Sequence, residues 1–321
     1  MHPRRALLAA TALALTAPAL AQPAWPTRPV RLVVPFPPGG PADLLGRALA
    51  EPLATAWGQP VGVENRGGAG GNLGAELVAR AVPDGHTLLL PASSHVQGAA
   101  LYTSLPFDPV RDFTAITAIA DYALVLVVHP SVPATTLAEF RALAGSAPGK
   151  VTLASAGVGT PTHLSAERYR LRAGIEFTHV PFQGAAPAHA ALLGGQVMAM
   201  FTNPVLAIPA IRAGTLRGIA TTGAARSKQL PSLPTIAESG FPDYEATTWY
   251  GFLGPAHLPP AIAQRIHATT QQALAAPALL ARFAAMGLEP MHDDPAAFTA
   301  RMTQDLARWT QVIRAANLRM E

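Results

Sequence analysis

The chain has 321 residues, of which 50% are hydrophobic, 13% charged and 6% aromatic, so it is long enough for two compact lobes and too apolar for a disordered protein. Its formal net charge is +4, but it has only two lysines and its arginines are scattered, which argues against a nucleic-acid surface. It contains no cysteine, which excludes disulfides, thiolate metal sites, a cysteine nucleophile and a lipid-modified N-terminal cysteine.

The first 21 residues have the pattern of a secretory signal peptide. Arg4 and Arg5 form a basic start, residues 6–16 an apolar stretch too short for a stable membrane anchor, and residues 19–21 a small-x-small cleavage site. Cleavage before Gln22 lowers the formal net charge to +2. We therefore expect an exported protein in the periplasm of a Gram-negative bacterium, with a mature chain that is not inserted in the membrane. A retained N-terminal anchor is the alternative.

Strands and helices alternate after the signal peptide. Apolar runs predict strands at 28–36, 60–65 and 86–94, and apolar residues at helical spacing predict helices at 43–57 and 75–82. In the first helix, we expect one buried face (Leu44, Leu45, Ala48, Leu49 and Leu53) and a kink or early end at Pro52. This β-α-β-α-β order predicts a mostly parallel sheet with helices on both faces.

Residues 113–130 hold two strand-like runs that we expect to pass from one lobe to another. Thr136 and Glu139 then form a capping box for a helix at 137–145. The alternation then repeats. We expect strands at 150–157, 175–182, 196–203 and 216–223, with helices at 161–174 and 187–195. A loop at 230–249, a returning strand at 250–256 and two final helices at 260–286 and 295–316 follow.

The returning strand predicts an inserted domain, because the last helices need a sheet on which to pack. We expect domain 1 to comprise residues 22–124 and 247–321, and domain 2 residues 125–246. Two α/β lobes joined by strand crossovers leave a central cleft, and ligands of open α/β sheets bind at the carboxyl ends of strands.

Three short stretches lead from a strand end through small residues into a helix start. They are PFPPGGPAD at 35–43, LASAGVGTPTHL at 153–164 and HVPFQGAAPA at 179–188. Free N–H groups at a helix start bind anions. Asp43 is expected to accept hydrogen bonds from neighbouring amides. The glycine-rich stretch at 67–74 does not fit a dinucleotide loop, because Leu73 stands where the third glycine belongs.

No catalytic or metal-binding spacing stands out. Ser155 is not in a Gly-x-Ser-x-Gly elbow, and Ser94 lies beside a histidine without the order of a triad. A serine hydrolase using Ser155 or Ser94 remains an alternative. His95, His163 and His189 fit loop or helix-surface positions better than metal ligands. Asn203 fits a cleft donor or a turn residue, and Trp249 a cleft wall or a core position.

Together these motifs resemble the Bug-type substrate-binding proteins of tripartite tricarboxylate transporters. The resemblance rests on WPTRPVRLVVPFPPGGPAD, VENRGGAGGNLGAE, PDGHTLL, FDPVRDFTAIT, ASAGVGTPTHL, HVPFQGAAPA, LLGGQV and LPTIAESGFPDYEATTWYGFLGPA, which occur in this order over nearly the whole mature chain. It implies a type II periplasmic binding protein fold that closes on a small carboxylate, without a cofactor or metal. It also implies a monomer that works with large and small membrane transporter subunits; a ligand sensor for a signalling partner is the alternative.

The resemblance also implies the binding residues. They come from the first loop, the facing helix start, a third wall and two further positions: Phe36, Pro38, Gly39, Gly40 and Asp43; Ser155, Ala156, Gly157, Gly159, Thr160 and His163; Phe182, Gln183, Gly184 and Ala185; Ser94 and Asn203. Many relatives carry tyrosine and lysine where this chain has Phe182 and Gln183, and an acidic residue at Met198. The lost cation favours a monoanion, an amide or a neutral ligand.

Overall fold

The computed structural model describes residues 25–102 and 104–319. The predicted signal peptide and its cleavage site lie outside these residues. The elements up to the first crossing between lobes are β1 (Val30–Val34), α1 (Pro41–Trp57), β2 (Val61–Asn65), the 3-10 turn η1 (Ala69–Gly71), α2 (Asn72–Ala79), β3 (Thr87–Leu89), α3 (Ser94–Gln97), η2 (Ala99–Leu101) and β4 (Phe113–Ala123).

The remaining elements follow after a single residue, Leu124. They are β5 (Val125–Val128), α4 (Leu137–Ser146), β6 (Thr152–Ser155), α5 (Pro161–Ala173), β7 (Thr178–Pro181), α6 (Ala185–Leu193), β8 (Ala199–Thr202), α7 (Pro204–Arg212), β9 (Arg217–Thr221), β10 (Thr247–Pro255), α8 (Pro260–Leu274), α9 (Pro277–Met286), β11 (Glu289–Pro290) and α10 (Pro295–Ala315).

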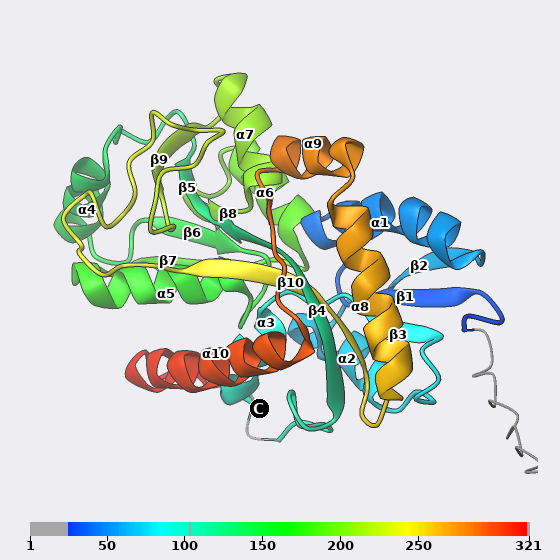
Figure 1. Cartoon of the computed structure of the whole chain (residues 1–321). Helices are drawn as coiled ribbons and strands as arrows, with labels where there is room; N and C mark the ends of the chain where they lie inside the picture. Colours follow the sequence, from blue (N-terminus) through cyan, green and yellow to red (C-terminus); the bar gives the residue numbers. More distant parts are fainter. Residues whose placement is uncertain (1–24, 103, 320–321) are drawn as a thin grey trace, which may run out of the picture.

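Two sheets form two lobes (Figure 1). The first lobe contains a six-stranded sheet in the order β11-β4-β10-β3-β1-β2, and the second a five-stranded sheet in the order β7-β6-β8-β5-β9. Strands β1, β2 and β3 are parallel, as are β7, β6 and β8, whereas β4, β5, β9, β10 and β11 pair antiparallel. The sheets are therefore mixed as expected, but less parallel than the sequence pattern predicts, because the connecting strands enter them in the opposite direction.

Strands β4 and β10 connect the lobes. They pair antiparallel along their length, from Thr247 opposite Ala123 to Pro255 opposite Phe113. Where they approach the second lobe, the Leu124 carbonyl accepts from the Thr222 N–H, and the Thr222 carbonyl accepts from the Ala246 N–H. These bonds fix the crossing region to β9. In Figure 1 both strands run through the middle of the molecule between the lobes.

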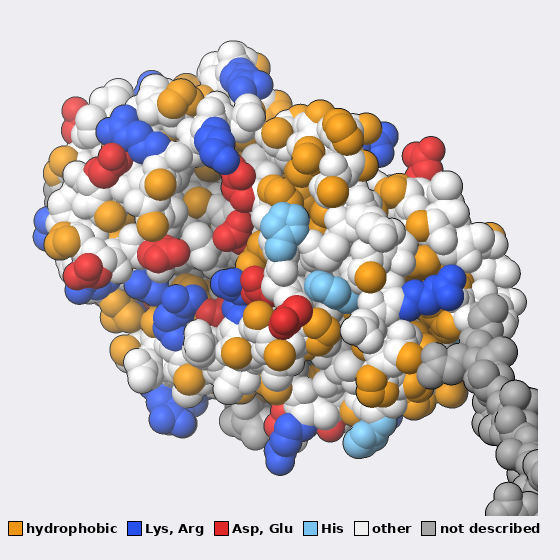
Figure 2. All heavy atoms as spheres, viewed as in Figure 1, with side chains coloured by type: hydrophobic (Ala, Val, Ile, Leu, Met, Phe, Trp, Pro, Cys, Tyr) orange, Lys and Arg blue, Asp and Glu red, His pale blue; other side chains and the backbone are white. Residues whose placement is uncertain are grey.

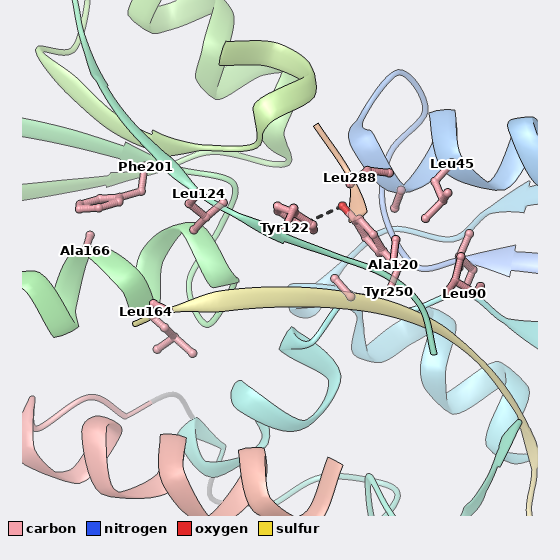
Figure 3. Close-up of a cluster of buried hydrophobic side chains, with 14 of the residues drawn as sticks. Leu45, Leu90, Ala120, Tyr122, Leu124, Leu164, Ala166, Phe201, Tyr250 and Leu288 are labelled. Carbon is pink, nitrogen blue, oxygen red and sulfur yellow. Dashed lines mark hydrogen bonds between the residues drawn. The ribbon is translucent and has the colours of Figure 1, made fainter. Parts of the chain in front are cut away.

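One apolar core continues from lobe to lobe. Figure 3 shows Leu45 and Leu90 of the first lobe and Phe201 and Leu164 of the second on either side of the connecting strands. All four are fully buried. Burial of each such side chain contributes about 1.5–3 kcal/mol, so the crossing is held by packing as well as by backbone bonds.

Several predictions about individual elements are confirmed and others are wrong. The capping box at Thr136 and Glu139 is present. Helix α1 continues through Pro52 to Trp57, so the predicted early end is wrong. Leu44 is 39% exposed and does not share the buried face of Leu45 and Leu49.

The C-terminal part holds three helices instead of the predicted two. The stretch 260–286 divides into α8 and α9 at Ala275 and Ala276, because Pro277 cannot continue a helix and instead begins the next one. Helix α3 begins at Ser94, so the third strand ends earlier than predicted. No helix among the described residues is both long and apolar enough to cross a membrane.

Candidate functional site

A small cavity lies between the lobes, at the carboxyl ends of strands. This inner pocket has about 50 Å³ accessible to the centres of water molecules. It is lined by Phe36, Pro37, Pro38, Gly40, Pro41, Ala42, Ala92, Tyr122, Ala156, Thr160, Pro161, Thr162, Gly184, Ala185, Ala186, Pro187, Asn203 and Tyr250. None of these lining residues carries a charge, so any ionic ligand here must be held by dipoles and hydrogen bonds.

Four helix N-termini meet at the inner pocket. The N-cap residues are Gly40 of α1, Thr160 of α5, Gly184 of α6 and Asn203 of α7, and all four line the cavity. Each helix start carries about half a positive charge. Helices α5, α6 and α7 have no acidic residue in the first turn, so nothing there offsets their dipoles. The combined field favours an anion.

Unpaired N–H groups accompany these dipoles. The N–H groups of Ala42, Ala185 and Ala186 find no acceptor among the described residues, and all three residues line the inner pocket. Proline at the first position of α1, α5 and α7 removes a further N–H there. The first turn of α6 therefore offers the densest set of free donors to a ligand.

Helix α1 is the exception among the four, because Asp43 lies in its first turn. The Asp43 carboxylate accepts from the Gly39 N–H at 3.0 Å and from Arg47 Nε at 3.1 Å. Burial opposes its charge, but these bonds outweigh that effect, and the pKa of Asp43 lies below its ordinary value. Asp43 therefore fixes the predicted turn, and its negative charge partly offsets the dipole of α1.

The connecting strands contribute two tyrosines to the inner pocket. Tyr122 on β4 donates to the Tyr250 hydroxyl on β10 at 3.2 Å, and their rings stack with centroids 5.3 Å apart (Figure 3). Asn203 Nδ2 donates to both hydroxyls, at 3.0 and 3.3 Å. Burial raises the pKa of both tyrosines above the ordinary value, so both are neutral at physiological pH.

A second cavity, the outer pocket, shares Phe36, Pro37, Ala156, Thr160 and Gly184 with the inner one. It is larger, about 220 Å³ on the same measure, and is also lined by the glycine-rich turn 68–71 of the first lobe and by residues 157–158 and 181–183 of the second. The glycine-rich stretch is thus a close turn at the cleft. At Gly70 it comes close to the second lobe, because a Cβ atom there would be 3.4 Å from the Val158 carbonyl oxygen.

The predicted site residues divide into three groups. The inner pocket is lined by Phe36, Pro38, Gly40, Ala156, Thr160, Gly184, Ala185 and Asn203. The outer pocket adds Gly157, Phe182 and Gln183. Neither pocket is lined by Gly39, Asp43, Ser94, Ser155, Gly159 or His163, and ligand contact by these six stays a prediction. In the structure they support the walls: Gly39 binds Asp43, Ser94 accepts from Gly98 through its carbonyl, and Gly159 donates to His163 Nδ1 at 3.2 Å.

His95, His163 and His189 are buried, contrary to the loop or helix-surface positions expected from the sequence. His163 stacks on His179 with ring centroids 4.0 Å apart. Burial lowers the pKa of His163 to about 3 and that of His179 to about 4, and their mutual repulsion contributes to the lowering at His163. His95 is buried against Phe107 and Phe113. The rings of His95, His163 and His179 pack between elements of the fold, and burial keeps them neutral there.

Ser155 and His179 form a hydrogen bond of 2.6 Å, which resembles half of a catalytic triad. Three observations argue against that role. Ser155 is fully buried and lines neither pocket. The ring beside His179 is His163 instead of an orienting carboxylate. A histidine with a pKa near 4 is also a weak general base at neutral pH. Among the described residues, no group of three or more acidic or histidine side chains could hold a metal ion.

Sequence reasoning missed Tyr122 and Tyr250 as site residues. Both lie in apolar strand patterns that predict core. Their common signal is position: each lies within a few residues of a predicted crossing between domains, at 124 or 247. Trp249, for which a cleft wall was one expectation, is a core residue instead. Its Nε1 donates to Asp305 at 2.7 Å and its ring packs on Phe298.

The surface shows no basic patch on the face seen in Figure 2, where Lys and Arg side chains lie among Asp and Glu side chains. Arg226 pairs with Glu238, and Lys228 pairs with Glu289. A nucleic-acid surface would require one sign of charge over a continuous area. The mixed charges on this face therefore agree with the scattered arginines of the sequence, and both observations argue against nucleic-acid binding.

Comparison with known proteins supports the same interpretation. The protein BugT of Bordetella pertussis is 35% identical over 299 residues, covering 92% of each chain. The structure of periplasmic binding protein BugD matches with a TM-score of 0.88 and 32% identity, over 92% of this chain and all of that one. The structure of R. palustris Rpa4515 with adipate matches with a TM-score of 0.88 and 33% identity, over 92% of this chain and 99% of that one.

A family profile described as "Tripartite tricarboxylate transporter family receptor" matches residues 45–318. This span includes both sheets except β1. The chain belongs to the tripartite tricarboxylate transporter receptor family and has the two-lobed fold of periplasmic binding proteins.

Proposed function

We propose that this protein is a periplasmic receptor that captures a small carboxylate between its lobes and delivers it to a membrane transporter. The observation that carries the proposal is the meeting of four helix N-termini at one uncharged cavity. The solved relative with adipate binds a carboxylate, which agrees with this chemistry. The partners would be the polytopic and small membrane subunits of such a transporter.

The available donors are sufficient for useful affinity. Micromolar binding requires about 8 kcal/mol. Each hydrogen bond to a charged group contributes about 1.5–3 kcal/mol and each helix start about 0.3–1 kcal/mol. Three free N–H groups and three uncompensated dipoles therefore reach the micromolar range without an arginine or lysine in the pocket.

In this proposal the two lobes move relative to one another when the ligand binds. We place domain 1 at residues 22–124 and 247–321 and domain 2 at 125–246, with closure about the strands that connect them. A ligand that contacts both lobes shifts the equilibrium toward the closed form by its differential affinity. The same proposal includes removal of the signal peptide and a monomeric mature protein.

Thermal melting of the mature protein tests the proposal. We expect one or more mono-, di- or tricarboxylates at about 100 times their Kd to stabilise the fold by about 2.7 kcal/mol, whereas the corresponding methyl esters leave the melting temperature unchanged. If no carboxylate shifts the melting temperature, or if esters act equally well, the proposal is wrong.

A variant at the start of α6 tests the mode of binding. Proline fits the first position of a helix but lacks an N–H, so Ala185→Pro removes one free donor while retaining the turn. We expect carboxylate affinity to fall at least tenfold, the effect of one charged hydrogen bond. Ala185→Ser retains the N–H and is the matched control. Transport is tested separately, by uptake of the bound acid in cells with and without the gene.

A further inference from the structure

The three polar side chains of Tyr122, Tyr250 and Asn203 leave one hydrogen without a partner. Asn203 Nδ2 donates to both hydroxyl oxygens. The Tyr122 hydroxyl hydrogen is donated to Tyr250. The Tyr250 hydroxyl thus accepts twice, and its own hydrogen has no acceptor among the described residues. Since Tyr250 lines the inner pocket, this hydrogen is available to a ligand.

Asn203 is the N-cap residue of α7, so its backbone is fixed by the start of this helix. Its side chain does not bond the helix start. Its amide instead reaches the two tyrosines of the connecting strands. The cluster therefore joins the second lobe to both strands and fixes the hydroxyl pair beside the cavity. All three side chains are buried.

The surroundings of the cluster are neutral. The remaining walls of the inner pocket consist of proline, alanine, glycine and threonine residues and Phe36, and no lining residue is charged. The helix starts compensate one negative charge, so a second carboxylate placed in the same pocket would be buried without a further partner and would repel the first, which is strongly unfavourable. A methyl group placed here would leave the Tyr250 hydrogen unpaired, which is also unfavourable. A neutral oxygen would satisfy the hydrogen at no cost in buried charge.

We propose that Tyr122, Asn203 and Tyr250 select a ligand with one carboxylate and, at its other end, a neutral hydrogen-bond acceptor such as a hydroxyl or carbonyl oxygen. This inference rests on the receptor function proposed above and narrows its ligand class. The helix starts hold the carboxylate, and the Tyr250 hydroxyl donates to the neutral oxygen. Dicarboxylates and plain alkanoates of the same length bind more weakly.

Calorimetric titration of the mature protein with matched acids tests this selection. The probes are the alkanoate, the ω-hydroxyalkanoate and the α,ω-dicarboxylate with four, five and six carbons. We expect the ω-hydroxy acid of at least one length to bind ten times more tightly than both of its matched acids. Tyr250→Phe should reduce this preference to less than threefold.

Tyr244→Phe provides the matched control. Tyr244 is a buried tyrosine that donates to the Ser165 carbonyl at 3.0 Å and lines neither pocket. Tyr244→Phe loses one internal hydrogen bond, whereas Tyr250→Phe loses the two that its hydroxyl accepts. We expect Tyr244→Phe to retain the tenfold preference. The order of affinities in the unsubstituted protein already decides the selectivity, so the proposal stays testable if Tyr250→Phe does not fold.

The outcomes separate this proposal from the receptor function. If a dicarboxylate or alkanoate binds as tightly as its ω-hydroxy match, if Tyr250→Phe weakens all three acids equally, or if only other carboxylates bind, the selection is wrong and the receptor function stands. If no carboxylate of any kind binds, both proposals are wrong.

Discussion

Gly98 and Gly159 belong to different lobes and lie in contact. A Cβ atom added to Gly98 would be 3.1 Å from the Gly159 carbonyl oxygen. A second contact lies in the pocket wall, where a Cβ atom on Gly184 would be 3.3 Å from Pro37 Cγ. The lobes thus touch at two places, and glycine allows the close approach at both.

Gly98→Ala should therefore weaken ligand binding. The backbone of Gly98 has φ −80° and ψ −13°, which alanine adopts readily, so the added methyl group acts mainly by separating the lobes. We expect carboxylate affinity to fall about tenfold, because the closed form becomes less populated. The measurement is calorimetric titration.

Gly145→Ala is the control for Gly98→Ala. A Cβ atom at Gly145 meets nothing within 4 Å, and the residue lies in α4, which contributes no residue to either pocket. Its affinity should be unchanged. Unchanged affinity in Gly98→Ala as well would show that the contact with Gly159 does not limit closure.

Trp249→Phe should reduce stability without changing affinity. The substitution removes the hydrogen bond to Asp305 and part of the contact with Phe298. Asp305 retains its ion pair with Arg308. We expect a loss of about 1–3 kcal/mol in the free energy of unfolding, measured by denaturant titration. A change in ligand affinity larger than threefold would instead indicate that Trp249 forms part of the cleft wall.

The sequence predicts the loops of the site well, because the residues that form each loop are close together in the chain. An apolar run, small residues and a proline at a helix start occur within about ten residues of one another, as at Phe36 to Ala42 and at Ser155 to Pro161. The physical cause of the site, a strand end followed by a helix N-terminus, is equally local. Eleven of the seventeen predicted residues line one of the two pockets.

The tyrosine pair could not be predicted in this way. Tyr122 and Tyr250 are 128 positions apart, and they meet only because β4 and β10 pair in one register, with Tyr122 opposite Thr248 and Tyr250 opposite Ala120. This places the rings diagonally on the same face. A shift of one residue would turn one ring to the other face, and nothing local to either strand sets that register.

Acid should destabilise the protein through His95. This side chain is fully buried, and burial lowers its pKa to about 4 although its Nε2 contacts the Pro109 carbonyl at 2.9 Å. Between pH 6.5 and about 4 the unfolded chain takes up a proton at His95 that the folded protein does not, so stability falls as the pH falls through this window. At pH 5 the loss from this one group approaches about 2 kcal/mol.

Melting curves from pH 7.5 to 4.5 measure this loss. We expect a falling melting temperature, and a shallower slope in His95→Gln, which has no titrating group at this position. Equal slopes in the two proteins would contradict the role of His95.

Gln183→Lys should change the ligand preference toward dianions. Gln183 is exposed at the rim of the outer pocket, where an ammonium group pairs with a carboxylate that the inner pocket cannot accommodate. We expect the affinity for adipate to rise about tenfold relative to hexanoate, which corresponds to about 1.4 kcal/mol. The gain should decrease with added salt, because an exposed ion pair is screened. Gln196→Lys adds the same charge at an exposed position that lines neither pocket, and it should leave the ratio unchanged. An equal gain in both variants would mean that net charge, instead of a charge at the pocket, attracts the dianion.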